Sequence, residues 1–427
     1  MIAEVMAHVT KERLEEAVCG LVNVPSPTGA EAPAAAWLAE YLDGGRIQSI
    51  DDRQANAVAT LPGGDGPSTL LYAPLDTFTT GDPAHDLPWA GPELRPDMMP
   101  RATVHGDLVQ GLGAGNPKGH AACVAVALAA LARSGVTPPG DVVAGFGAGG
   151  MPSFAVDSGG RANTGHGVGA GFLLERGYTT DHAVIAKPGW HVSHEEVGLV
   201  WLDVLVPGIH TYVGSRHRLP YRNAVALAGE VAAHLENWLA TYAERHEHGT
   251  MRPQGVVSSV TGGFDRLAAS TPALVRLRLD VRLTTAQTPA SVTREIRAEM
   301  RRLGERLGAD LRVEQVAAIP ATHTPPSSPI VLATVGAWEA VNGSRHELVN
   351  ANSGATDANI LRMRGVPTAR VGMPKVVVAR GGGPVDFTLG MNLVSLDAMS
   401  RLVEVLVRTV LTIAEVEKGA VSTREAG

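Results

Sequence analysis

Apolar positions along the first part of the chain follow the spacings of helices and of buried strands in turn. From Glu12 the apolar positions up to Leu21 recur at helical spacing, and Thr28 followed three residues later by Glu31 predicts a capping box at the start of a second helix. Strand-like apolar runs cover 56–61, 70–73, 141–146 and 182–186, with one helix over 118–133 and another ending near 176. Strands that alternate with helices predict a three-layer α/β domain.

The pattern changes at Val197. A long apolar strand, GLVWLDVLV, precedes a helix over 222–244, strands over 255–260 and 274–283, a helix over 291–303 and a strand near 311. This order predicts an α+β domain over 197–318, inserted into a first domain made of 1–196 and 319–427. The proline-rich segment 317–329 has the composition of a linker. Beyond it the α/β pattern resumes and ends in a helix from 396 to about 414.

Composition narrows the classes of partner. The chain has 427 residues, 44% of them hydrophobic, and a formal net charge of -7, which offers no electrostatic surface for nucleic acid or an anionic membrane. The longest apolar run, Ala121–Ala132, is too short to span a bilayer, and the charged first sixteen residues lack the apolar stretch of a signal peptide. We therefore expect a cytoplasmic protein that acts on a small molecule. Cys19 and Cys123 are expected to be buried thiols.

Five sets of short segments, in order, carry a resemblance to a known family. They are VPSPTGAE (24–31), LLYAPLDT (70–77), GLGAGNPKGHAA (111–122), AVIAKPG (183–189) with GIHTYVG (208–214) and RNAV (222–225), and SGATDANILRMRGVPTARVG (353–372). The chain resembles the dinuclear-zinc amidohydrolases that include aminoacylases, carboxypeptidase G, acetylornithine deacetylase and succinyl-diaminopimelate desuccinylase. The resemblance implies a zinc-peptidase-like α/β domain with an inserted lid that also forms a homodimer. An apolar edge at GLVWLDVLV and the alanine-rich face over 224–233 agree with self-association.

The family's metal ligands are replaced almost throughout. At the positions that the resemblance gives to zinc ligands or to the general base, this chain has Pro74, Asn116, Gly150, Met151 and Lys187. The C-terminal ligand histidine corresponds to Thr388 or, with a shift of two, to Asp386. The lid histidine and asparagine correspond to Tyr212 and Ala269. Such side chains are poor ligands for zinc, so we expect no metal and no other cofactor.

The replacements leave the charge of the site balanced. Four carboxylates are lost together with the four positive charges of two zinc ions, and the retained Asp76 faces the introduced Lys187. We expect Lys187 to stabilise an oxyanion, Asp76 to hold it or to move a proton, Tyr212 to donate a second hydrogen bond and Asn116 to orient an amide. Substrate-binding positions would be Lys118, His120, Asn223 and Thr388.

Each of these positions also has a structural interpretation. Lys187 could be an ordinary exposed lysine, Asp76 a loop cap, Tyr212 part of the lid core, Asn223 a helix cap and His120 a hydrogen-bonding group at a helix terminus.

Three other motifs have plainer explanations than function. GFGAGG matches a dinucleotide-binding glycine pattern, but no helix can begin cleanly across Met151-Pro152, so a remodelled loop fits better. We expect a solvated hinge, and not a set of metal ligands, at His191, His194, Glu195 and Glu196. His246 and His248 are expected on the surface.

Three classes of function remain open at this point. The first is a metal-independent enzyme acting on an amide or N-acyl amino acid-like molecule by hydrolysis, acyl transfer or cyclisation. The second is a non-catalytic homologue that binds a small molecule or serves as a partner subunit. The third is a zinc-dependent deacylase with substitute ligands.

Overall fold

The computed structural model describes residues 1–157, 161 and 163–425, with side chains described as far as residue 419. Its contacts divide the chain into two units. Unit 1 comprises 1–194, 324–348 and 356–427, and unit 2 comprises 195–323 and 349–355. The sequence places these boundaries after 196 and 318, and it does not anticipate that 349–355 joins unit 2.

Unit 1 is built on a mixed sheet with the strand order β1-β2-β6-β3-β7-β14. The strands are β1 (Arg46–Ser49), β2 (Ala55–Leu61), β3 (Thr69–Pro74), β6 (Val142–Gly147), β7 (His182–Ala186) and β14 (Thr368–Val371). β6, β3, β7 and β14 run parallel to one another, whereas β1 and β2 join them in antiparallel pairs. The carboxyl ends of the four parallel strands therefore share one edge, where open α/β sheets usually bind ligands.

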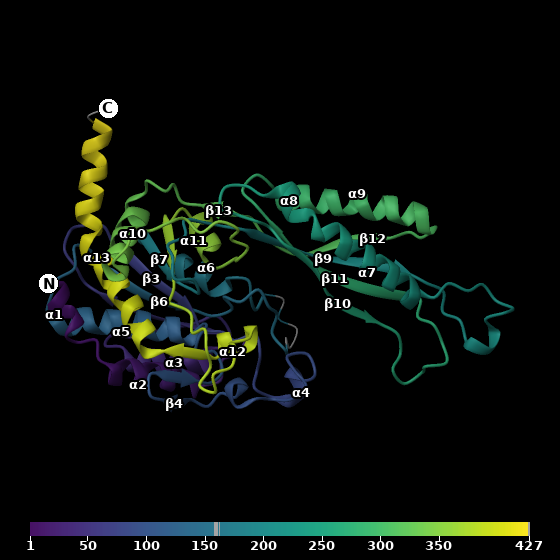
Figure 1. Ribbon diagram of the computed structural model, residues 1–427, viewed down its shortest axis with the longest axis horizontal. Helices are drawn as coiled ribbons and strands as arrows, with labels where there is room; N and C mark the ends of the chain where they lie inside the picture. Colours follow the sequence, from purple (N-terminus) through teal and green to yellow (C-terminus); the bar gives the residue numbers. More distant parts are fainter. Residues whose placement is uncertain (158–160, 162, 426–427) are drawn as a thin grey trace. The chain divides into compact units, whose positions relative to one another are not determined.

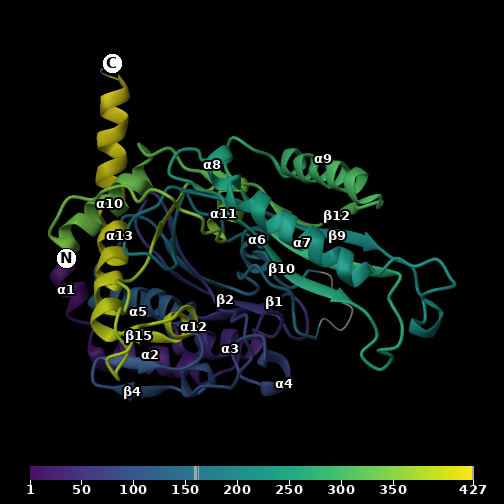
Figure 2. The same cartoon turned by 45° about the vertical axis from the view of Figure 1, so that its right-hand side comes forward.

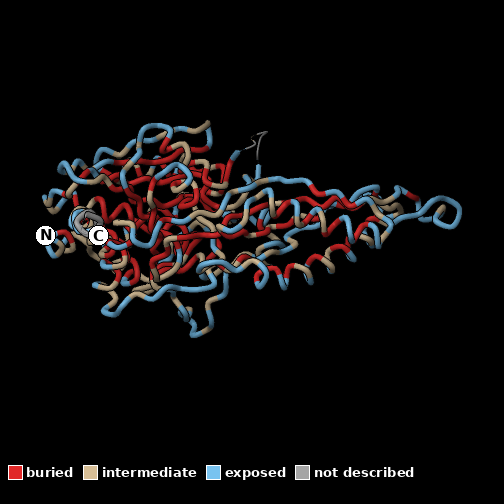
Figure 3. Tube along the Cα trace, turned by 90° about the horizontal axis from the view of Figure 1, so that it is seen from above, coloured by how far each residue is buried: buried red, intermediate tan, exposed pale blue. Residues whose placement is uncertain are grey.

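Helices cover both faces of this sheet, as Figures 1 and 2 show. One core contains residues of α2 (Lys11–Val22), α3 (Ala32–Tyr41), α5 (Lys118–Ser134), α10 (Pro329–Asn342) and α13 (Leu396–Glu425). The other contains residues of α6 (Val168–Glu175) and α11 (Ala358–Met363). Every residue of β3, β6, β7 and β14 is buried, and Figure 3 shows buried and exposed positions along the chain trace. The predicted three-layer α/β architecture is confirmed.

Shorter elements complete unit 1. They are α1 (Ile2–Met6), α4 (Pro83–Asp86), α12 (Phe387–Met391), the 3-10 helix η1 (Pro96–Met98) and a small sheet of β4 (Thr103–His105), β5 (Leu108–Gln110) and β15 (Leu393–Ser395). None of the described helices combines the length and apolar composition that a membrane span requires.

Unit 2 is an antiparallel sheet with two long helices packed on one face. Its strand order is β10-β11-β9-β12, and apolar residues alternate along its central strands into a core shared with both helices. The elements are β9 (Gly198–Pro207), β10 (Gly255–Gly262), β11 (Leu274–Leu283), β12 (Arg312–Ile319), α7 (Ala224–Ala240), α8 (Tyr242–His246), α9 (Pro289–Leu307), η2 (Val213–Ser215) and the short pair β8 (Glu195–Glu196) and β13 (Thr322–His323). The predicted α+β character is confirmed.

Two local predictions are wrong. The segment GLVWLDVLV is not an edge: it forms β9, which is hydrogen-bonded on one side to β11 and on the other to β12. The supposed linker 317–329 is largely structured, because its first residues continue β12 and Thr322–His323 pairs with Glu195–Glu196. Prolines there end strands and begin α10, so composition alone misplaces the linker.

Self-association through unit 2 stays a prediction, and the exposed edge that could carry it is β10. Val256 and Val260 on this strand are 46% and 63% exposed. An edge strand with exposed apolar residues is a ready surface for pairing with a second copy.

We expect a dimer in sedimentation velocity at micromolar concentration, and we expect Val260→Lys to shift it to monomer. Leu332→Lys on α10, also at an exposed apolar position, should leave the dimer intact; a wild-type protein that sediments only as monomer would contradict the prediction.

Candidate functional site

Several predicted site residues of unit 1 gather at the carboxyl edge of the parallel strands. Asp76 lies two residues beyond β3, Gly150 and Met151 follow β6, and Lys187 follows β7 directly. Lys118 and His120 lie in the first turn of α5. The fold therefore brings the segments together because each follows a neighbouring strand or begins the helix packed against them.

The carboxylate of Asp76 accepts hydrogen bonds from three donors in two other segments of the protein. Its Oδ1 accepts the backbone N–H of Gly150 at 2.7 Å, the N–H of Met151 lies 3.2 and 3.0 Å from its two oxygens, and the hydroxyl of Thr28 donates to Oδ2 at 2.7 Å. The predicted capping box is thus wrong. α3 begins at Ala32 after Glu31, with no side-chain cap, since the Thr28 hydroxyl is committed to Asp76. The alternative of Asp76 as a cap of its own loop fails for the same reason.

A second carboxyl group lies beside Asp76. Glu31 Oε1 accepts the N–H groups of Gly29 and Gly149, each at 2.9 Å. Burial, and then the charge of Asp76, raise the pKa of Glu31 to about 8. Glu31 is not predicted from the sequence as part of the site, because its place three residues after Thr28 suggests a helix cap.

Tyr72 and Asp357 form a further buried pair. The phenol donates to Asp357 Oδ2 at 2.7 Å, and burial together with the nearby carboxylates raises the pKa of Tyr72. Both residues fall in segments that carry the family resemblance, yet neither is predicted as a site residue. Tyr72 looks in the sequence like an ordinary residue of a buried strand.

The site has no room for a carboxylate at position 150. A Cβ atom on Gly150 would lie 2.4 Å from Pro74 Cβ and 2.5 Å from Asp357 Oδ2. Among the described residues, no group of three or more His, Cys, Asp or Glu side chains is arranged to hold a metal ion. With the oxygens of Asp76 engaged by protein donors, the residues at this edge do not fit a dinuclear zinc centre.

Lys187 is buried, so its interpretation as an ordinary exposed lysine is wrong. Only 4% of the surface of Lys187 is exposed, and its Nζ lies 3.8 Å from the sulfur of Met151. Burial raises the pKa of Asp76, and the Thr28 hydrogen bond and then the charge of Lys187 oppose that rise. The same charge contributes to lowering the pKa of His120. One buried cation thus acts on both groups.

Lys118 and His120 have different surroundings although they share one helical turn. Lys118 is fully buried and donates from Nζ to the carbonyl of Val24 at 2.7 Å, and burial lowers its pKa to about 7. His120 is 2% exposed, and burial lowers its pKa to about 3, so its imidazole is neutral. Lys118 has a structural contact, whereas His120 lines a cavity.

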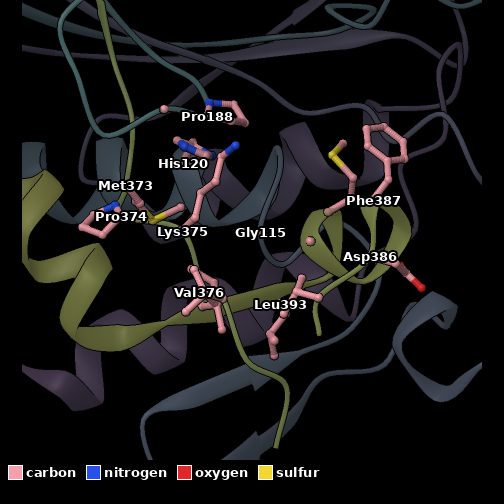
Figure 4. Close-up of a pocket in the computed structure, with 16 residues that line it drawn as sticks. Gly115, His120, Pro188, Met373, Pro374, Lys375, Val376, Asp386, Phe387 and Leu393 are labelled. Carbon is pink, nitrogen blue, oxygen red and sulfur yellow. The ribbon is translucent and has the colours of Figure 1, made fainter. Parts of the chain in front are cut away.

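This cavity has a volume of about 440 Å³, within the range of small-molecule sites. Figure 4 shows His120, Pro188 and Lys375 toward one end and Asp386 and Phe387 toward the other. Its remaining lining is mostly apolar and comes from Met373, Pro374, Val376, Val377, Val385, Met391, Leu393 and Val394. Pro188 and Gly189 of its wall follow Lys187 directly, so the cavity adjoins the segment that carries the buried cation.

Asn116 and Thr388, which lie at positions that the resemblance gives to zinc ligands, both line a smaller hollow. The amide of Asn116 donates to the sulfur of Met391 at 3.5 Å. Asp386, the alternative to Thr388, accepts the Leu389 N–H at 2.7 Å as the cap of α12 and pairs with Arg95 at 2.8 Å. Its carboxylate is therefore committed to structure.

Tyr212 and Asn223 belong to unit 2. Tyr212 is 58% exposed, so its interpretation as lid core is wrong. Asn223 caps α7 by accepting the Val225 N–H at 3.0 Å, and it also lines a cavity of about 250 Å³ that includes Ala269. A catalytic role for Tyr212 and a substrate-binding role for Asn223 stay predictions.

The remaining motifs serve structure. The hinge around Glu195 and Glu196 is not solvated as predicted: both residues are buried, and Glu195 accepts hydrogen bonds from the N–H and hydroxyl of Thr250. Gly145 and Gly147 of GFGAGG are residues of β6, Gly149 and Gly150 lie in the turn after it, and the next helix of the described residues begins at Val168. Both cysteines are free, with Cys123 buried as expected and Cys19 partly exposed.

Comparison with solved structures shows what this fold is similar to. A dipeptidase from Saccharomyces cerevisiae superposes with a TM-score of 0.71 at 12% identity, over 97% of this chain and 98% of that one. Human carnosine dipeptidase gives 0.69 at 14% identity, over 97% and 99%. An M20 family metallo-carboxypeptidase from Sulfolobus solfataricus gives 0.65 at 12% identity, over 93% and 98%. No protein-family model matches the sequence. The resemblance is confirmed as a fold: the chain has the scaffold of M20 peptidases and amidohydrolases.

The tight packing at Gly150 predicts a loss of stability on adding a single methyl group. Gly150→Ala should lower the free energy of unfolding by about 1–3 kcal/mol, since Pro74 and Asp357 must shift. Gly336→Ala is the control, because its Cβ would meet nothing within 4 Å and alanine favours the helix by about 1 kcal/mol. Denaturant titration measures both; equal stability of Gly150→Ala and wild type would show that the site is loosely packed.

The raised pKa of Glu31 predicts that stability falls as pH rises. Between about 4.5, its ordinary value, and about 8 the folded state binds more protons than the unfolded state, so the free energy of unfolding decreases over this window. Glu31→Gln, which stays neutral, should remove on the order of 2–4 kcal/mol of that decrease between pH 5 and pH 9. Denaturant titrations at both pH values test this, with the exposed Glu40→Gln as control; an unchanged slope in Glu31→Gln would contradict the assignment.

Proposed function

We propose that this protein is an enzyme that acts on an amide or N-acyl amino acid-like small molecule without a resident zinc ion. The scaffold supports chemistry at a C–N bond, because the dipeptidases and carboxypeptidase that share it act on such bonds. We propose in addition that the reaction proceeds without a metal ion and that the residues named below carry it out.

The observation that carries the proposal is the rebuilt centre at the carboxyl edge of the sheet. Where two zinc ions would need carboxylates and histidines, Asp76 is held by backbone N–H groups, Gly150 is closed in by Pro74, and Lys187 supplies a buried positive charge. A buried carboxylate that has lost its metal costs several kcal/mol unless other donors or a cation compensate it. Here both kinds of compensation are present, which supports a site adapted to work without metal.

The reaction would depend on charge that develops at the amide oxygen. As a nucleophile adds to the carbonyl carbon, the C=O electron pair moves to oxygen, and the Lys187 ammonium would stabilise that oxyanion. Asp76 would hold Lys187 in place, and Asn116 would orient the amide. Hydrolysis, acyl transfer and cyclisation all pass through this oxyanion.

A non-catalytic binding function is the second candidate, and one specific observation favours it. The groups that could move protons are poorly suited to do so: the pKa of His120 is lowered to about 3, and the Asp76 carboxylate already accepts three donors. Such a site could bind a ligand in its pocket without catalysing a reaction.

Replacement of Lys187 distinguishes the two candidates. Lys187→Met should lower turnover of a panel of N-acyl amino acids about 100-fold or more, because one fixed charge at an oxyanion is worth that much. Lys187→Arg should not rescue it, since a guanidinium is too broad for the place of an ammonium. The exposed Lys418→Met is the control.

The same samples test whether the protein holds zinc and needs it for turnover. We expect less than one zinc per chain by elemental analysis and turnover that a chelator does not reduce. Full activity of Lys187→Met would remove the residue from the mechanism, stoichiometric zinc with chelator-sensitive activity would favour substitute ligands, and the absence of turnover on the whole panel would favour the binding protein.

A further inference from the structure

Lys375 places a positive charge at one end of the 440 Å³ cavity. It lines the cavity, and Figure 4 shows its side chain extending toward the end where His120 and Pro188 lie. Within the part of the chain that the structure describes, no hydrogen bond or ion pair engages its amine. The other charged residue of the lining, Asp386, lies toward the opposite end and pairs with Arg95 at 2.8 Å. The amine of Lys375 is therefore available to a ligand.

The surroundings of this end favour a ligand of negative charge. His191 packs against Gly189 of the lining, where an added Cβ would lie 2.6 Å from the His191 ring. Burial, with a contribution from the charge of Lys375, lowers the pKa of His191 to about 4, and burial with the charge of Lys187 lowers the pKa of His120 to about 3. Both imidazoles are neutral near pH 7, so the charge that meets an anion in the cavity comes from Lys375.

Most of the remaining lining is apolar and indicates what is attached to the anion. It consists of valine, leucine, methionine and proline side chains. At the end away from Lys375, Phe387 is 75% exposed and stacks on Phe78 with ring centroids 6.2 Å apart. Exposed apolar side chains beside an apolar cavity mark a surface that an apolar ligand covers.

We propose that this cavity binds an apolar monocarboxylate, with the carboxylate at the Lys375 amine and the apolar chain along the cavity toward Phe387. The inference rests on the proposed function only in taking the cavity as the place of the substrate. It adds the residue that selects a negative charge and the apolar character of the group attached to that charge.

Three small probes test the charge and the chain separately by calorimetric titration at pH 7: octanoate, octylammonium and acetate. Octanoate should bind about tenfold more tightly than octylammonium, because the latter has the same chain but places a like charge beside Lys375. It should also bind at least tenfold more tightly than acetate, which has the charge without the chain. Octylammonium or acetate binding as tightly as octanoate would overturn the inference.

Replacement of Lys375 tests its part in the selection. Lys375→Met should weaken octanoate about fivefold, the upper range for an exposed ion pair, because the ligand covers part of the amine, and it should not weaken octylammonium. Lys375→Glu should reverse the preference, so that octylammonium binds more tightly than octanoate. The exposed Lys418→Met, outside the cavity lining, is the control and should keep the wild-type affinities.

Gly390→Leu locates the binding. Gly390 lines the cavity, and an added Cβ there meets only Val385 at 3.5 Å, so the fold can accept a side chain that fills the cavity. This variant should weaken octanoate at least tenfold. Octanoate affinity that is unchanged in Lys375→Met or in Gly390→Leu would overturn the inference, and so would the absence of octanoate binding.

The same measurements separate this inference from the proposed function. A protein that binds octanoate through Lys375 yet turns over no N-acyl amino acid would keep the inference and end only the catalytic proposal. Turnover that depends on Lys187, in a protein that does not bind octanoate, would end the inference and keep the catalytic proposal.

Discussion

The hydrogen bonds that Asp76 accepts are the constraint on which the rest of the site depends. They join the segment after β3 to the turn after β6 and to the loop before α3, so three separate parts of the chain meet on one carboxylate. With its oxygens engaged in this way, the backbone at Gly150 is drawn against Pro74, and a larger side chain is excluded. The same contacts that stabilise the anion thus fix the geometry of the sheet edge.

Electrostatics extends this constraint from the buried carboxylate to the cavity. Lys187 favours the charged form of Asp76 and disfavours the charged form of His120, because the same positive charge acts on an acid and a base with opposite effects on their pKa values. Burial and the charge of Asp76 raise the pKa of Glu31 to about 8, so Glu31 keeps its proton near neutral pH. The edge therefore combines one hydrogen-bonded carboxyl group, one neutral acid and one neutral imidazole.

The fold was predictable from periodicity because alternating strands and helices with distinct apolar patterns leave few arrangements. The site was predictable only in part. The residues after strands β3, β6 and β7 could be placed at one edge, but Thr28 and Glu31 have the spacing of a helix cap, and only the tertiary contact with Asp76 shows otherwise. The central place of β9 could not be predicted either, since an apolar strand has the same pattern in the middle of a sheet as at a covered edge.

The packing also couples the positions that the resemblance gives to zinc ligands. A glutamate at 150 would need Pro74 and Asp357 to move, because its Cβ would lie 2.4 Å from Pro74 Cβ and 2.5 Å from Asp357 Oδ2. Lys187 would meanwhile oppose a metal ion beside Asp76, because like charges repel strongly in a buried site. Neighbouring substitutions with shared contacts are not additive. A zinc ligand introduced alone at one of these positions would therefore meet a steric or electrostatic cost that the neighbouring residues impose.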